Sequence, residues 1–341
     1  RKISGGTMII PYEALLDKFE SILKSRGFTA EKAHTAAEVF AQNSLDGVYS
    51  HGVNRFPLVI AYLDKGGIDP AATPEKIAAF GCMERWDGHL GLGILNARLM
   101  MDRACDIAKT QGMGLVAIGR TNHWMRGGTY GWQAADRGFI GICWTNTSPN
   151  LSPWGGKTPK IGNNPFIIAV PKSDGAHVII DCALSQFAFG KIEEAKLAGR
   201  QLPVPGGYDT AGNMTTDPVE IEKTGRALPI GYWKGSGLSV VLDLVGALLS
   251  GGDTVGDIGR KYDMEIGLTQ VMIAIDPSRF IGKEKADALI ERVIADMKSS
   301  EPVKAGGKIA YPGESSLKTR RENLKNGIPV VDSVWEKIKN L

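Results

Sequence analysis

The sequence has only four cysteines among its 341 residues. Cys82, Cys105, Cys143 and Cys182 form no Cys-x-x-Cys pair and have no adjacent histidine. Disulfide frameworks and zinc sites need closely grouped cysteines or histidines, so neither is indicated. We therefore expect no metal site and a protein of a reducing compartment, the cytoplasm.

Long hydrophobic runs and an excess of one charge are also missing. The most apolar segments, residues 165–171 and 236–249, are shorter than the roughly 20 residues that a membrane-spanning helix needs. Forty basic and 37 acidic side chains leave a net charge of +3, and no basic block alternates with aromatic residues. These features argue against a membrane protein and against nucleic acid as a partner. The residues before Met8 have no apolar periodicity and no signal-peptide core, so we leave them outside the predicted fold.

The glycine fingerprint of a Rossmann dinucleotide site is absent as well. That fingerprint is G-x-G-x-x-G directly after a strand and at the start of a helix. Gly91-Leu92-Gly93 lacks the third glycine and a preceding apolar strand, and Gly112-Met113-Gly114 comes before a strand instead of after one. A dinucleotide would therefore have to be bound by another arrangement.

The chain is long enough, and with 43% hydrophobic residues apolar enough, for two lobes. Residues 11–65 repeat apolar positions every three or four residues, which predicts helices. Short β-rich runs follow at residues 114–118, 139–145, 165–170, 177–181 and 268–276. The connection 171–176 is too short for a helical crossover, so the strands on either side should pair antiparallel.

We therefore predict an α+β fold in three parts. Residues 8–85 form the N-terminal part of a helical lobe, and residues 86–276 form an α+β lobe. Residues 277–341, with a helix over 284–300, form a helical C-terminal part that packs back on the N-terminal lobe.

The first candidate for chemistry is the segment Tyr49–Arg55. Ser50 is a candidate N-cap, after which His51 and Arg55 would lie one turn apart on the same helix face. A 2-oxo acid reductase needs a proton donor that titrates near neutrality and a cation for the carboxylate, and this pair offers both. A capping turn with a surface histidine and a solvated arginine fits the same residues.

A second cluster, with Asn122 and His123, follows the strand that begins at residue 114. Gly127-Gly128 precede a helix there and expose backbone N–H groups that could receive an anion. The alternative is a loop whose tryptophans pack in the core. Asp181, at the end of another strand, is either a contact to a ribose hydroxyl or the cap of a turn.

A third cluster precedes the helix that starts near residue 236. Lys234 could neutralise a phosphate and Trp233 could stack on a flat ring, between glycines that allow close approach. A simple glycine cap explains the same pattern.

Several segments together resemble the malate/L-lactate dehydrogenase family that lacks a Rossmann fold: YSHGVNRF, NHWMRGGTYGWQA, GICWTN, IGNNPF, LAGRQLP and GYWKGSG. The resemblance runs from about Ile10 to Leu341. It implies a lobe around a mixed, largely antiparallel sheet that binds NAD, with NADP as an alternative, and a helical lobe built from both chain ends. It also implies a homodimer with its sites near the subunit interface, and NADH-dependent reduction of a small 2-oxo acid to the 2-hydroxy acid.

The resemblance further implies the roles of individual residues. His51 is the proton donor, and Ser50, Arg55, Asn122 and His123 belong to the substrate pocket. The implied cofactor-binding residues lie in three stretches, namely His177, Val178, Ile179, Ile180, Asp181, Cys182 and Ala183, then Trp233 and Lys234, and finally Gly313, Glu314 and Ser315.

Within the family, Trp124-Met125-Arg126 is similar to the branch that acts on 2,3-diketo-L-gulonate, so we expect this or a related sugar acid as substrate. Malate, lactate, ureidoglycolate or a cyclic imine are the alternatives within the family, and a non-catalytic sugar-acid binding protein is the alternative outside it. Three features depart from the family pattern: Asn163 replaces a threonine, residues 147–156 differ, and no histidine follows Gly313.

Overall fold

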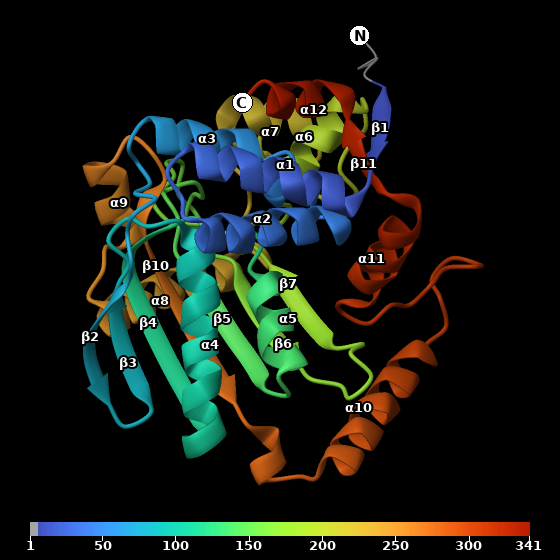
Figure 1. Ribbon diagram of the computed structural model, residues 1–341. Helices are drawn as coiled ribbons and strands as arrows, with labels where there is room; N and C mark the ends of the chain where they lie inside the picture. Colours follow the sequence, from blue (N-terminus) through green and yellow to red (C-terminus); the bar gives the residue numbers. More distant parts are fainter. Residues whose placement is uncertain (1–5) are drawn as a thin grey trace.

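The computed structural model describes residues 6–341 and has an α+β architecture (Figure 1). Seven strands form one sheet in the order β2-β3-β4-β10-β5-β6-β7, in which β3 and β4 are parallel and the other neighbours antiparallel. The strands are β2 Glu75–Phe80, β3 Met83–Asp87, β4 Met113–Asn122, β5 Ile140–Thr145, β6 Phe166–Val170, β7 Val178–Cys182 and β10 Ile266–Ile275. The predicted mixed, largely antiparallel sheet is confirmed.

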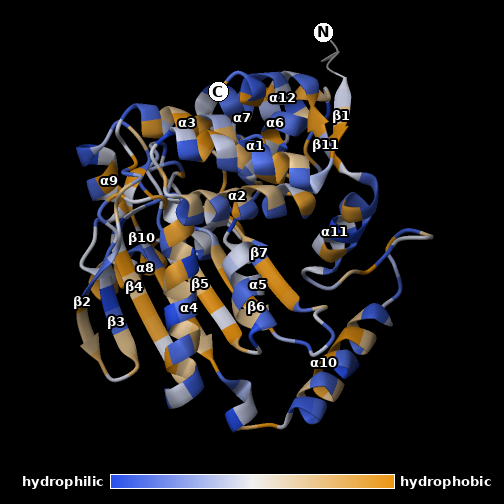
Figure 2. Cartoon of the chain, viewed as in Figure 1, coloured by the Kyte–Doolittle hydropathy of each residue, from blue (hydrophilic) through white to orange (hydrophobic). Residues whose placement is uncertain are grey.

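Helices cover both faces of this sheet. α4 (Gly93–Gln111) and α5 (Gly128–Asp136) lie on one face, and α8 (Trp233–Ser250) lies on the other (Figure 1). Side chains alternate along β4, so Val116 and Ile118 join the core under α4 and α5 while Ala117 joins the core under α8. Figure 2 shows that β4 and β7 carry mostly hydrophobic residues.

Both chain ends build a second, helical lobe above one end of the sheet (Figure 1). It contains α1 (Tyr12–Ser25), α2 (Ala30–Leu45), α3 (Phe56–Asp64) and α12 (Asp332–Lys339). Phe19 and Phe56 stack at 4.3 Å between ring centroids, and Phe40 meets Phe56 edge-on at 5.0 Å. The apolar periodicity of residues 11–65 is thus the core of this lobe.

A two-stranded sheet ties the two chain ends together. β1 (Thr7–Ile10) pairs antiparallel with β11 (Ile328–Val331). Thr7, which the sequence analysis left outside the fold, is therefore part of it, whereas residues 1–5 lie outside the described residues. Each strand has only four residues and its partner lies at the other end of the chain, so neither was recognisable alone.

Two predicted boundaries need correction. The hairpin of β2 and β3 belongs to the central sheet, although most of it falls within the predicted helical region 8–85. α10 (Lys283–Lys298) does not pack on the N-terminal lobe with α12 and with α11 (Glu314–Asn326). It lies instead beside the turn between β6 and β7, where the Ser173 backbone N–H donates to Asp287 Oδ1 at 3.1 Å.

The chain between β7 and β10 holds further elements that the sequence analysis did not predict. They are α6 Phe189–Leu197, β8 Gly207–Tyr208, β9 Met214–Thr215, α7 Pro218–Thr224 and α9 Val255–Lys261. Over residues 6–341, no single helix is long and apolar enough to cross a membrane, and only the bent pair of α8 and α9 meets that criterion, when both helices are counted together.

Candidate active site

His51 lies in the short 3-10 turn Tyr49–His51, and α3 begins only at Phe56 with Arg55 as its N-cap. The prediction that Ser50 caps a helix carrying His51 and Arg55 on one face is therefore wrong. The backbone leaves helical geometry at Gly52, where a Cβ atom would lie 2.2 Å from Ser44 Oγ on α2. Close packing of the turn against α2 thus overrides the helical spacing.

The turn holds the His51 ring in place from two directions. Ser50 Oγ lies 2.9 Å from His51 Nδ1, and the His51 carbonyl oxygen accepts a hydrogen bond from Asn43 Nδ2 at 2.9 Å. Burial lowers the pKa of His51 to about 4, the nearby charge of Asp181 acts against this, and the charge of Arg55 lowers it further. His51 is therefore neutral at neutral pH in the ligand-free pocket.

His123 comes from the end of β4 and stacks on His51, with ring centroids 5.9 Å apart and planes 15° from parallel. Its Nδ1 accepts the Met125 backbone N–H at 3.0 Å, which leaves the proton of the neutral ring on Nε2. Burial lowers the pKa of His123 well below its ordinary value, and the charge of Arg55 adds to this. The pocket therefore holds two uncharged imidazoles side by side.

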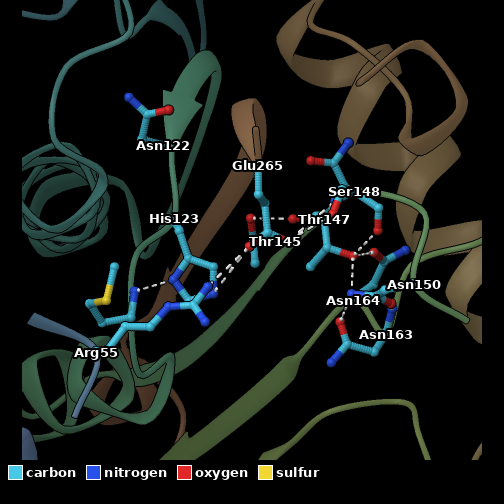
Figure 3. A network of polar contacts seen from close by, with 12 residues as sticks. Arg55, Asn122, His123, Thr145, Thr147, Ser148, Asn150, Asn163, Asn164 and Glu265 are labelled. Atoms are coloured by element: carbon cyan, nitrogen blue, oxygen red, sulfur yellow. Dashed lines mark hydrogen bonds and ion pairs between the residues drawn. The ribbon is translucent and has the colours of Figure 1, made fainter. Parts of the chain in front are cut away.

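Glu265, which the sequence analysis missed, completes this group (Figure 3). Its Oε2 lies 3.4 Å from Arg55 Nη2 and 4.0 Å from His123 Nε2. Its Oε1 accepts from the backbone N–H and the hydroxyl of Ser148, both at 3.3 Å. A carboxylate directly before a strand was the only sequence signal, and it became meaningful only because Ile266 pairs with Asn122.

Asn122 has a structural role that the sequence analysis did not assign to it. Its Nδ2 donates to the carbonyl oxygens of Leu90, Gly91 and Gly67 at 2.7, 3.1 and 3.3 Å. In Figure 3 its side chain points away from His123. Asn122 also lines the pocket with Arg55 and His123, so its place in the substrate pocket stays a prediction, while its amide N–H groups hold the neighbouring loops.

The start of α5 receives an anion, but from this chain itself. The Gly128 backbone N–H donates to Asp181 Oδ2 at 2.9 Å, and Arg126 Nε lies 3.6 Å from the same oxygen. Gly127 and Gly128 are buried, so the expected open anion site is occupied by Asp181. Trp124 is fully buried, which agrees with the alternative that this loop packs into the core.

Behind the pocket lies a buried charge network centred on Asp46. Its carboxylate pairs with Arg126, and it accepts from Arg320 Nε and Nη2 at 2.7 and 2.8 Å. Burial opposes ionisation, but the hydrogen bond from Arg320 and the charge of Arg126 hold the pKa of Asp46 below its ordinary value. The network joins α2, the loop before α5 and α11, and so connects the two lobes.

The stretch from His177 to Ala183 forms the edge strand β7 and its flanks. His177 is buried, with Nε2 2.9 Å from Asp136 Oδ1 and Nδ1 accepting the Lys172 backbone N–H at 2.9 Å. The Ile179 side chain belongs to the core. These two residues can therefore offer a cofactor only their backbone, whereas Ile180 and Asp181 are exposed.

The other two predicted cofactor stretches meet this strand at its two ends. The Ile179 N–H donates to the Pro312 carbonyl at 2.8 Å, which brings Gly313, Glu314 and Ser315 beside the start of β7. Gly313 has φ +99°, and a Cβ atom there would lie 3.1 Å from the His177 carbonyl oxygen. Glycine thus permits this close approach.

At the other end of β7, the Ile230 N–H donates to the Leu184 carbonyl at 2.8 Å. This contact brings the start of α8 near the strand. Trp233 is 63% exposed there, and Lys234 Nζ lies 5.8 Å from the centre of its ring. An edge strand with an exposed aromatic ring and a lysine suits an elongated, anionic, ring-containing molecule such as a nicotinamide dinucleotide.

The described residues contain no group of three or more histidine, cysteine or acidic side chains arranged to hold a metal. All four cysteines are free thiols.

Two of the departures from the family pattern, Asn163 and the segment 147–156, contact one another. Asn163 donates its backbone N–H to Asn150 Oδ1 at 2.8 Å, and Asn150 Nδ2 donates to Asn163 Oδ1 at 2.9 Å. Asn150 lies in the divergent segment 147–156, two residues after Ser148. The two departures thus support one another beside the pocket (Figure 3).

Comparison with known proteins agrees with the fold and identifies a family. The malate/L-lactate dehydrogenase family matches residues 10–339. The chain is 47% identical to 2,3-diketo-L-gulonate reductase of Citrobacter koseri over 334 residues, covering 98% of this chain and 100% of that protein. The Escherichia coli K12 reductase of the same name is 46% identical with the same coverage.

Solved structures give the same result. Sulfolactate dehydrogenase from Methanocaldococcus jannaschii is similar with a TM-score of 0.88 and 31% identity, covering 98% of this chain and 96% of that one. Malate dehydrogenase from Pyrococcus horikoshii is similar with a TM-score of 0.87 and 28% identity, covering 98% and 94%. The chain therefore belongs to the malate/L-lactate dehydrogenase family.

Proposed function

We propose that the chain is an NADH-dependent reductase of 2,3-diketo-L-gulonate or a closely related sugar acid. Membership of a dehydrogenase family makes it an oxidoreductase that uses a nicotinamide cofactor. The observation that carries the proposal is that His51 stacks on His123, which lines one pocket together with Arg55. The names of the relatives at 46–47% identity support the choice of substrate.

In this proposal the nicotinamide, when bound, supplies a hydride to the keto carbon. The proton for the carbonyl oxygen comes from His51 Nε2, because Nδ1 is occupied by Ser50. An anionic 2-oxo acid raises the pKa of His51 by its charge, so the imidazole takes up a proton as the substrate binds. Arg55 supplies the cation that pairs with the substrate carboxylate.

Lys234 and Trp233 are proposed to hold the cofactor from the start of α8, with the β7 edge and the loop at Gly313 on its other side. Their exposure and the approach of both segments to β7 support this assignment. NADH is preferred over NADPH in the proposal on family resemblance. The free cysteines are consistent with the cytoplasm as the location.

We also propose that the protein is a homodimer, with the outer face of α8 in the interface. Val241, Leu244 and Leu248 are 53%, 51% and 82% exposed and follow one another at helical spacing. An exposed apolar stripe of this kind is typical of a surface that a partner covers. Sedimentation velocity should give a dimer, and Leu248→Lys should shift it to monomer with loss of activity. Full specific activity in a confirmed monomer would refute a shared site.

The substrate assignment is tested by following NADH and NADPH oxidation with a panel of 2-oxo acids. The panel contains 2,3-diketo-L-gulonate, oxaloacetate, pyruvate and a cyclic imine acid. The proposal expects the highest kcat/KM with the sugar acid and NADH. A higher value with another substrate assigns a different member of the family, and binding of the sugar acid without turnover indicates a non-catalytic binding protein.

A further inference from the structure

We infer that Glu265 determines which 2-oxo acids the pocket accepts, by accepting hydrogen bonds from hydroxyl groups on the substrate's carbon chain and by repelling a second acid group. The inference rests on the proposed function and narrows its substrate class to polyhydroxylated monocarboxylates.

The position of Glu265 brings it close to a substrate bound at Arg55. Glu265 lines one pocket with Arg55, His123 and Asn122. Its side chain is only 14% exposed, so it is directed into the protein and not into bulk solvent. A substrate whose carboxylate pairs with Arg55 would bring its remaining atoms close to Glu265, because Arg55 Nη2 and Glu265 Oε2 are 3.4 Å apart.

The charges around Glu265 disfavour a substrate with a second acid group. Arg55 is the cation that contacts Glu265, and burial keeps His51 and His123 neutral before substrate enters. One carboxylate of a substrate therefore already competes with Glu265 for Arg55. A second carboxylate would meet Glu265 without a further cation in contact with it, and like charges at such distances repel strongly in a poorly solvated site.

The Glu265 carboxylate can accept further hydrogen bonds. A carboxylate only accepts, and each oxygen can accept about two hydrogen bonds. Ser148 donates twice to Oε1, whereas Oε2 has a long 3.4 Å contact to Arg55 and lies 4.0 Å from His123 Nε2, which is beyond hydrogen-bond distance. Oε2 therefore has room for a hydroxyl donor, and a sugar acid carries several.

The loop that holds Glu265 is itself braced. Ser148 belongs to the segment that Asn150 fixes through its reciprocal hydrogen bonds with Asn163. This brace holds the Oε1 donors in place and so aims Oε2 at the pocket. The carboxylate can then discriminate by position, because it is not free to turn away.

A competing explanation is that Glu265 only orients Arg55. The two explanations differ in what happens to pyruvate, which has neither distal hydroxyl groups nor a second acid group. If Glu265 acts only through Arg55, its removal affects every 2-oxo acid alike. If Glu265 interacts with the distal groups of the substrate, its removal changes kcat/KM for pyruvate little. The kcat/KM values for the sugar acid and for oxaloacetate then change in opposite directions.

The experiment measures kcat and KM of wild type and Glu265→Gln with 2,3-diketo-L-gulonate, oxaloacetate and pyruvate at saturating NADH. We expect kcat/KM for the sugar acid to fall tenfold or more, mainly through KM, which is the scale of losing a charge-assisted hydrogen bond. The value for oxaloacetate should rise, and that for pyruvate should change less than about threefold. Ser148→Ala should lower the ratio of kcat/KM for the sugar acid to kcat/KM for oxaloacetate, as Glu265→Gln does, but by a smaller factor. Glu75→Gln, an exposed carboxylate on β2, should leave it unchanged.

An unchanged ratio between sugar acid and oxaloacetate, or an equal loss for all three substrates, overturns the inference while the proposed function stands. A higher kcat/KM of the wild-type enzyme for oxaloacetate than for the sugar acid overturns both the inference and the proposed function. Thermal melting of each variant shows that the comparison is made between folded proteins.

Discussion

The proposed substrate pocket and the proposed cofactor-binding edge are built in opposite ways. The pocket residues His51, Arg55, His123 and Glu265 come from three distant parts of the chain, are partly or largely buried, and contact one another. The proposed cofactor edge consists of one strand and two short loops, with Trp233 63% exposed.

This difference indicates a division of labour. Burial changes the protonation of the pocket imidazoles, so this region can control proton transfer. An exposed edge with backbone groups and a lysine can bind an anion but has little means of tuning chemistry. Changes in the pocket should therefore act on turnover, and changes at the edge on cofactor affinity.

The largest effect is expected from His51→Asn. Removing the proposed proton donor should lower kcat by about 100-fold or more, up to roughly 10,000-fold, while the Kd for NADH stays within about twofold. Stopped-flow kinetics and NADH fluorescence titration measure the two quantities. Near-normal turnover would move the proton donor elsewhere, with His123 as the first candidate.

A large loss of stability is expected from Asp46→Ala. Arg320 would lose its carboxylate partner and Arg126 would keep only the longer 3.6 Å pair with Asp181, and breaking such a buried ion pair costs about 3–5 kcal/mol. Urea unfolding measures the loss. Asp64→Ala is the matched control, because its pair with Arg26 is more exposed and should contribute at most about 1 kcal/mol. Equal losses in both variants would show that the network does not hold the lobes together.

The pH dependence of stability should reveal the buried state of His51. Its pKa is lowered from 6.5 to about 4, so the unfolded chain binds more protons between these values. Stability should therefore fall as pH decreases through this window, by roughly 3 kcal/mol from His51 alone, and His123 acts in the same direction. Unfolding of wild type and His51→Asn across this range measures the share of His51. Parallel curves for the two proteins would contradict a depressed pKa.

The smallest effect is expected at the cofactor edge. Lys234→Ala should raise the Kd for NADH about tenfold to hundredfold, the scale of a lost charge-assisted contact, with kcat at saturating NADH almost unchanged. Lys223→Ala, an exposed lysine on α7, is the control and should change neither quantity. An unchanged Kd would remove Lys234 from the binding surface, and a large loss of kcat would erase the contrast between the two regions.

The sequence by itself determined the class of the fold and many of its longer elements. Apolar periodicity is a local property, so the helices of residues 11–65 and the strands from β4 to β7 were predictable. The short connection between β6 and β7 also determined their antiparallel pairing. The motifs around His51 and His123 carried the family resemblance, and hence the reading of the chain as a reductase.

Only the tertiary structure decided how these residues meet. Packing of Gly52 against α2 placed His51 in a turn instead of a helix, and the pairing of Ile266 with Asn122 brought Glu265 to the pocket. In the folded protein the Asn122 amide donates to the neighbouring loops, and the Gly128 N–H at the start of α5 donates to Asp181. Such outcomes depend on contacts between residues far apart in the chain and on the burial that shifts their pKa values. No local pattern records either property.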